Sequence, residues 1–172
     1  MNNLIRLVEG QACIIDNDPW KLFAADSPAD VPLILPFEQW RERQPAEVLA
    51  GQALSCDGLL LQADDESEVL HPWLASLPLI AIDFPSFRDG RGYSQAYLLR
   101  TRLGWRGELR AVGDVLRDQL AHMRQCGFDA FAVRADKSLE DALKGLAGLS
   151  VLYGRSAIEP RPLFRRERLN TQ

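Results

Sequence analysis

The stretch LIAIDFPSFRDGRGYSQAYLLR, residues 79–100, joins an apolar run to an amphipathic pattern through a charged turn that contains glycine. Residues 79–82 are apolar and include two β-branched isoleucines, which predicts a buried strand. Further on, Ala96, Leu99 and Leu103 recur at helical spacing and predict a helix with one apolar stripe. The stretch therefore predicts a strand–loop–helix unit, and the rest of the chain repeats this plan.

Short apolar runs recur at a spacing of roughly 21–29 residues, which is the length of a strand with its covering helix and two loops. Because the runs are continuous and do not alternate with polar residues, we expect a parallel sheet covered by helices on both faces. The sequence thus predicts an α/β fold of repeated βα units, with a mainly parallel sheet of about six strands, either open or an incomplete TIM-like barrel. The expected strands are 33–35, 59–61, 79–82, 109–112, 130–133 and 151–153.

The two ends of the chain differ from this repeat. Apolar residues 13–15 and 22–24 flank the turn-rich Asp16-Asn17-Asp18-Pro19, which predicts a small β-hairpin within about residues 11–25. Residues 155–172 carry five Arg against two Glu and show no apolar periodicity, so we expect an Arg-rich, extended C-terminal tail. Residues 1–154, hairpin included, are expected to form a single α/β domain.

Composition excludes several classes of protein. The chain has 172 residues, of which 47% are hydrophobic and 26% charged, as in an ordinary globular domain. The net charge is −4, and because the tail contributes +3 the remainder carries −7, which does not favour binding to nucleic acid. No apolar run reaches the length of a membrane span and the N-terminus does not resemble a secretory leader, so the expected location is the cytoplasm.

No metal or cofactor is expected. The three cysteines, Cys13, Cys56 and Cys126, lie far apart, and the two histidines have no companions at metal-ligand spacing. Phosphate-loop, dinucleotide and iron–sulfur motifs are all missing. Nor do the serines stand in a GxSxG motif that would indicate a hydrolase.

A binding site is expected where strands end and helices begin, because the loops at the carboxyl ends of parallel strands meet at one edge of the sheet. There the turn Arg88-Asp89-Gly90-Arg91-Gly92 combines arginines with free backbone N–H groups, which favours an oxyanion. The alternative is structural: the glycines shape a tight turn, and the arginines pair with nearby aspartates.

Arg110 is unusual because it lies inside an expected strand. An unpaired buried charge is very unfavourable, so Arg110 must reach the carboxyl edge or meet a carboxylate such as Asp83 or Asp114. These two aspartates are also candidates for a catalytic acid or base at this edge, and Arg134 follows the next expected strand as a further cation.

The segment IAIDFPSFRDGRGYSQAYLLRTRLGWRGELRAVGDVLRDQLAHMRQCGFDAFAVR, residues 80–134, resembles the core of a family of uncharacterised bacterial proteins labelled probable oxidoreductases involved in sulfite reduction. The resemblance implies a small accessory protein in sulfur assimilation and cysteine biosynthesis, with sulfite reductase as a partner. It implies no catalytic residue.

Three hypotheses remain open at this point. The first is an accessory protein that binds an oxyanion or the reductase through residues 83–91 and 110–114. The second is a small βα-barrel-like enzyme that acts on an anionic metabolite, with Asp83 or Asp114 as acid or base. The third is a scaffold or homo-oligomer in which the same residues only pack.

Overall fold

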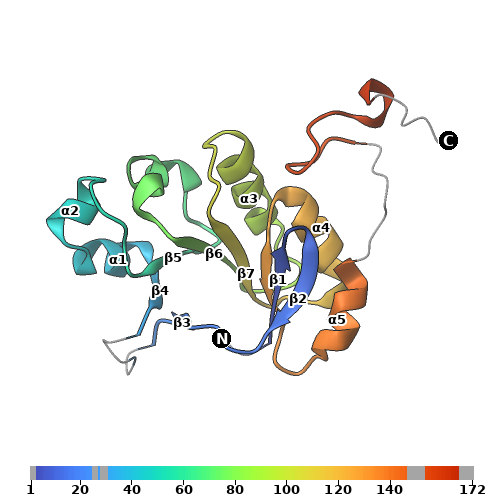
Figure 1. Ribbon diagram of the computed structural model, residues 1–172, viewed down its shortest axis with the longest axis horizontal. Helices are drawn as coiled ribbons and strands as arrows, with labels where there is room; N and C mark the ends of the chain where they lie inside the picture. The colour runs from blue at the N-terminus through green and yellow to red at the C-terminus, as the bar shows by residue number, and fades with distance from the viewer. Residues whose placement is uncertain (1–2, 25–26, 28–30, 147–153, 167–172) are drawn as a thin grey trace.

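The sheet is open, mostly parallel and eight-stranded in the computed structural model, which describes residues 3–24, 27, 31–146 and 154–166 (Figure 1). It curls like half of a barrel, and its strand order is β2-β1-β8-β7-β6-β5-β4-β3. The strands are β1 (Leu4–Val8), β2 (Gln11–Ile15), β3 (Lys21–Leu22), β4 (Leu33–Pro36), β5 (Gly58–Leu61), β6 (Leu79–Phe84), β7 (Glu108–Gly113) and β8 (Ala130–Ala132).

The helices pack on one face of this sheet. One core cluster unites their apolar residues, such as Trp40, Leu99 and Met123, with the alternate strand residues Ile80 and Ile82. The expectation that helices cover both faces is therefore wrong for the described residues. The helices are α1 (Phe37–Arg43), α2 (Ala46–Leu49), α3 (Arg91–Thr101), α4 (Leu120–Cys126) and α5 (Leu139–Leu146), with 3₁₀ segments η1 (Ser67–Ser76), η2 (Arg117–Gln119) and η3 (Leu163–Arg165).

The five expected strands between residues 33 and 133 are confirmed as β4 to β8, and they pair in parallel in chain order. The expected strand at 151–153 lies outside the described residues. Between β5 and β6 the chain forms the 3₁₀ segment η1 and no α-helix, and Pro72 lies inside it. Proline has no N–H to donate and its ring obstructs the preceding helical turn, which accounts for the missing α-helix.

The N-terminal hairpin is displaced from its expected position. β2 pairs antiparallel with β1, and the turn between them consists of Glu9 and Gly10, which both have positive φ angles of 50° and 82°. Positive φ at both turn residues is the geometry that two-residue hairpins require. β3 does not pair with β2, because it adds in parallel to β4 at the opposite edge of the sheet.

Residues 16–20 therefore cross the sheet from one edge to the other, on the face that the helices leave uncovered. Asp18 contacts Arg110 in β7, in the middle of the sheet. Trp20 packs further along against a second apolar cluster made of Ile34, Leu79, Ala81 and Val112. We call residues 16–20 the crossing segment.

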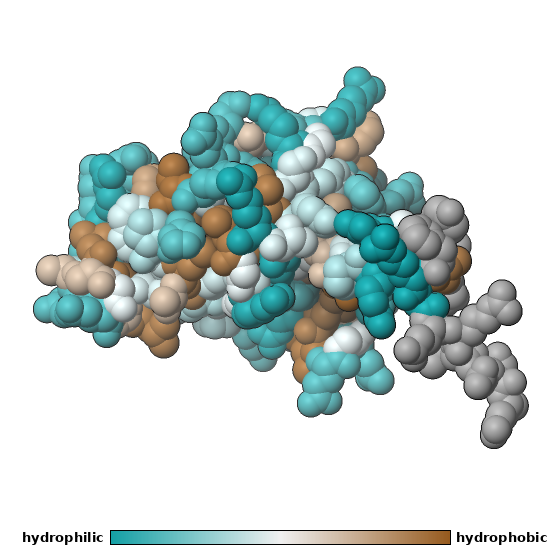
Figure 2. All heavy atoms as spheres, turned by 90° about the horizontal axis from the view of Figure 1, so that it is seen from above, coloured by the Kyte–Doolittle hydropathy of each residue, from teal (hydrophilic) through white to brown (hydrophobic). Residues whose placement is uncertain are grey.

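The tail is described as far as residue 166. It returns to the body near the end of α4, where Ala157 N–H donates to the carbonyl of Gln125 (2.8 Å). In the space-filling view, hydrophobic residues reach the surface at several places on the half that carries α1 and α2 (Figure 2).

Candidate functional site

The loop after β6, residues 85–90, is braced by hydrogen bonds from the neighbouring crossover. Phe87 N–H donates to Asp114 Oδ2 (2.9 Å), and Gln119 Nε2 donates to the Phe87 carbonyl (3.0 Å). Within the loop, Asp89 N–H donates to the Ser86 carbonyl (2.9 Å). Both backbone groups of Phe87 are thus held by side chains that follow β7, which fixes the loop on the carboxyl edge of the sheet.

This braced loop presents an aromatic ring and a guanidinium to solvent. Phe87 is 48% exposed, although phenylalanine is usually buried. The Arg88 guanidinium lies over its ring, 5.4 Å from the centroid. Aromatic residues, phenylalanine included, and arginine are enriched at protein interfaces relative to the rest of the surface.

Arg91, at the start of α3, is engaged by carboxylates. Its guanidinium bonds both oxygens of Asp89 and also contacts Asp64, in the loop after β5. These hydrogen bonds lower the pKa of Asp89 to about 2. Gly92 has a packing role, because a Cβ there would lie 2.7 Å from the Phe84 ring. Arg91 and Gly92 therefore serve the turn and its packing, whereas nothing within 4 Å of Gly90 requires a glycine at that position.

Asp114 and Arg134 form a second braced pair at the same edge. Arg134 Nη1 lies 2.8 Å from Asp114 Oδ1, and its Nε lies 2.6 Å from Asp136 Oδ1. The hydrogen bond from Phe87 N–H and then that from Arg134 hold the pKa of Asp114 below its usual value. A carboxylate held ionised in this way is poorly suited to act as a general acid near neutral pH.

Asp83 differs from the other acidic residues of the edge. Its carboxyl group makes no hydrogen bond or ion pair with the described part of the chain, and burial raises the pKa of this group. It lies at the end of β6 on the face opposite the helices, since its partner in register is Val112. Its Oδ1 also occupies the space that a Cβ on Gly113 would need.

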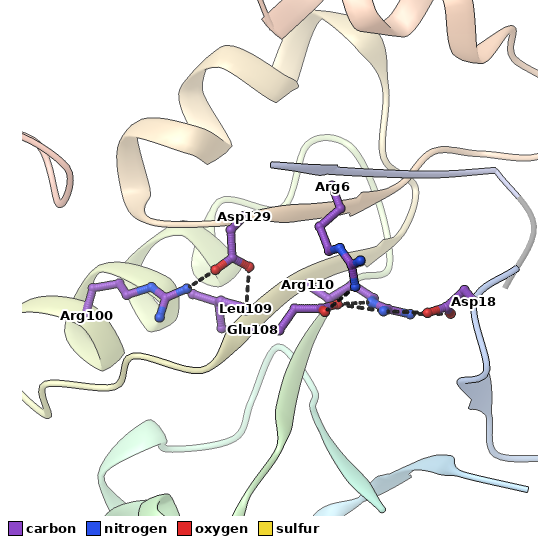
Figure 3. A network of polar contacts seen from close by, with 7 residues as sticks. All are labelled: Arg6, Asp18, Arg100, Glu108, Leu109, Arg110 and Asp129. Atoms are coloured by element: carbon purple, nitrogen blue, oxygen red, sulfur yellow. Dashed lines mark hydrogen bonds and ion pairs between the residues drawn. The ribbon is translucent and has the colours of Figure 1, made fainter. Parts of the chain in front are cut away.

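Arg110 is buried and lies apart from the loop of Phe87. Its guanidinium bonds Asp18 in the crossing segment (Nη1 to Oδ2, 2.7 Å) and Glu108 in its own strand (Nη2 to Oε1, 2.6 Å), and Arg6 joins through Glu108 (Figure 3). The expectation of a carboxylate partner is correct in kind, but the expected partners Asp83 and Asp114 are wrong. The sequence concealed Asp18 because 92 positions separate it from Arg110.

Arg100 is a second arginine with a buried side chain, and the sequence pattern did not assign it a role. Arg100 Nη2 donates to Asp129 Oδ2 (2.9 Å; Figure 3). Its other nitrogens donate to the carbonyls of Trp105, Gly107 and Gly127. Asp129 Oδ1 in turn accepts from Leu109 N–H at the start of β7 (2.8 Å). This network joins α3 to the loops that precede β7 and β8. The sequence contained one indication of this role: Arg100 is a basic residue in the last turn of an expected helix, where such side chains often bond carbonyl groups.

The described residues show no group of three or more histidine, cysteine or acidic side chains that could hold a metal ion. Cys126 is 9% exposed and burial raises the pKa of its thiol, so it is mainly protonated at neutral pH. Among the described helices, none combines the length and apolarity needed to cross a membrane.

Comparison with known proteins gives a family and no further relatives. A family model described as a bacterial protein of unknown function (DUF934) matches residues 58–164. No curated protein and no solved structure matches the chain. The matched residues include β5 to β8, the braced loop and both Asp114 and Arg134.

Proposed function

We propose that the chain, which belongs to the bacterial protein family of unknown function DUF934, is a non-redox accessory protein of assimilatory sulfite reduction that docks onto the reductase. The sequence resemblance described above supports the pathway. The docking element is the braced loop, and the observation that carries the proposal is its exposed Phe87 with Arg88 over the ring. A loop that is already held in place loses little conformational freedom on binding, which favours recognition.

The arrangement of charges favours a protein partner over a free oxyanion. Arg91 and Arg134 are already engaged by Asp64, Asp89, Asp114 and Asp136, so a small anion must compete with carboxylates for both. Arg88 contacts the Phe87 ring and no carboxylate among the described residues. An acidic group beside an apolar pocket on the reductase would satisfy Phe87 and Arg88 together.

The test is co-purification of the host's sulfite reductase with the tagged protein. Phe87→Ala and Arg88→Ala should each reduce the recovered reductase at least tenfold, since residues of this kind contribute about 2 kcal/mol or more at interfaces. Leu54→Ala and Arg102→Ala are matched controls, because Leu54 is 70% exposed and Arg102 forms only an exposed pair with Glu68. Equal recovery with all four variants, or no recovery with wild type, would refute the proposal.

Asp83 supports a second candidate function, that of a small enzyme acting on an anionic metabolite. An unpaired carboxyl group with a raised pKa, at the carboxyl end of a parallel strand, has the properties of a general acid or base. Carbon-13 NMR titration of the Asp83 carboxyl group tests this role directly. A pKa at or below the ordinary value of about 3.9 would remove Asp83 as a candidate.

A further inference from the structure

The two edges of the sheet are protected to different degrees. β3, at one edge, has only two residues, begins with Lys21 and follows Pro19 closely. Short length, lysine and proline are the devices by which proteins prevent edge strands from pairing. β2, at the other edge, has five residues, Gln11–Ile15, without charge or proline. In the described part of the chain no strand pairs with its outer side.

The hairpin geometry determines which backbone groups of β2 point outward. Val8 and Gln11 flank the two-residue turn and form a hydrogen-bonded pair, so the pairs alternate from there along the ladder. Leu7 N–H donates to the Asp129 carbonyl on the other side of β1, which agrees with this alternation. The N–H and C=O groups of Ala12 and Ile14 therefore point away from β1, toward the open side.

A second copy of β2 complements this edge. We propose that two chains pair antiparallel through β2, about a two-fold axis at Cys13, to form one continuous sheet. In this register Ala12 of one chain lies opposite Ile14 of the other, and all of their outward N–H and C=O groups find partners. Gln11 then lies opposite Ile15 and Asp16 opposite Gly10, so that no like charges meet.

The same register places the two Cys13 residues opposite each other. Because Cys13 points its backbone toward β1, the pair is of the non-hydrogen-bonded kind, in which the Cα atoms lie about 4.5 Å apart. That separation is within the range that a disulfide spans. Cys13 is exposed, and its thiol makes only a long contact of 4.0 Å with the Gln11 carbonyl. Two-electron oxidation by a mild oxidant such as diamide would join the two thiols, with release of two protons to the reduced oxidant.

Oxidative cross-linking tests the axis. The Cys56→Ser protein keeps Cys13 and the buried Cys126, and under diamide it should convert to a dimer that reduction reverses. The Cys13→Ser protein keeps Cys56, which is also exposed, and should remain a monomer on a non-reducing gel. A dimer that depends on Cys56, or no dimer from either protein, would contradict the proposed axis.

Light scattering without oxidant tests the interface itself. Arg6 lies opposite residue 13 in the same hairpin, so the lysine is introduced together with Arg6→Gln to avoid a like-charge pair within one chain. Wild type, Cys13→Ser and Arg6→Gln should each show twice the mass of one chain, whereas the double variant Arg6→Gln, Cys13→Lys should show the mass of one chain because two ammonium groups would meet at the axis. At high dilution the Tm of this double variant should match that of Arg6→Gln, Cys13→Ser, since residue 13 is exposed within the subunit. Monomeric wild type at high concentration, or a dimer that persists in the double variant with lysine, would overturn the inference. Neither outcome affects the Phe87 loop, whose test is binding of the reductase.

Discussion

Asp18 and Arg110 form an ion pair whose side chains are 1% and 0% exposed, with Asp18 Oδ2 2.7 Å from Arg110 Nη1. The pair fastens the middle of the crossing segment to the middle strands of the sheet, and Glu108 provides the second carboxylate. A buried guanidinium needs its charge to be compensated, and Asp18 and Glu108 both contribute to this compensation.

Removal of one partner should be strongly destabilising. We expect Asp18→Asn to lower the free energy of unfolding by about 3 kcal/mol, because it removes one of the carboxylates that compensate the buried charge of Arg110. Asp16→Asn, on the exposed part of the same crossing segment, should change it by less than about 0.5 kcal/mol. Urea denaturation at pH 7 measures both, and equal stabilities would show that the pair is not needed.

The same variant predicts a pH dependence. Burial by itself would raise the pKa of Asp18, but hydrogen bonding and attraction to Arg110 outweigh it and lower the pKa. The stability that Asp18 contributes is therefore complete above the unfolded-state pKa of about 3.9 and is lost as the pH falls through the lower, folded-state pKa. The difference between wild type and Asp18→Asn should stay constant from neutral pH to about pH 5 and narrow below about pH 4.

Asp83 should behave in the opposite way. Its pKa is raised by burial, so its charge reduces stability once the pH exceeds the unfolded-state value. We expect Asp83→Asn to raise the Tm by about 2 °C at pH 7. The gain should vanish below about pH 4, where the Asp83 carboxyl group is protonated in both the folded and the unfolded state. Asp114→Asn should lower the Tm, because Asp114 holds Phe87 N–H and Arg134. A fall in Tm for Asp83→Asn would show that Asp83 has a stabilising partner.

The Arg100 network should also be needed for stability. Arg100→Met removes the donor to three carbonyl groups and leaves Asp129 without its cation, so we expect a loss of about 3 kcal/mol. Arg100→Lys should recover only part of it, because an ammonium group does not have the planar fork of a guanidinium. Arg102→Ala is the control from the same helix end and should change stability by less than about 0.5 kcal/mol. Thermal and urea unfolding would show whether the two positions differ.

Gly113 is required by its backbone and by its surroundings. Its φ is +90°, and a Cβ there would lie 2.5 Å from the Phe84 carbonyl oxygen and 2.6 Å from Asp83 Oδ1. We expect Gly113→Ala to lower the free energy of unfolding by about 2 kcal/mol or more. Gly90→Ala should be nearly neutral, since its φ is −90° and no atom lies within 4 Å of the added Cβ. Similar effects at both positions would contradict this account.

The parallel strands could be predicted because they are continuous apolar runs, and β4 to β8 lie where those runs stand. Two features could not. The first is the position of the hairpin, since Asp16-Asn17-Asp18-Pro19 has the composition of a turn but extends across the sheet through the contact of Asp18 with Arg110. The second is that helices cover only one face of the sheet. A face covered by residues 16–20 requires the same apolar strand side chains as a face covered by a helix, so the apolar runs do not distinguish the two.

The site was predictable in place and less so in detail. The loop after β6 was expected from the rule that ligands collect at the carboxyl edge, and the structure does place Asp83, Phe87 and Asp114 there. The pairing of Arg91 with Asp64 involves the loop of a neighbouring strand, so it depends on strand order. The bracing of Phe87 by Gln119 joins residues that lie 32 positions apart, so no local pattern indicates it.

The strand order has a consequence for how the chain folds during its synthesis on the ribosome. β1 emerges before β8, yet it pairs with β8, so Leu4 meets its partner Ala132 only after that strand has been synthesised. The β3–β4 pair likewise joins the sheet only after β5 has emerged. The crossing segment can form its contact with Arg110 only after that residue has emerged. Contacts between distant parts of a sequence form slowly. The hairpin of β1 and β2 therefore remains with both sides unpaired until β8 has emerged, a state in which nascent-chain chaperones have an extended apolar strand to bind.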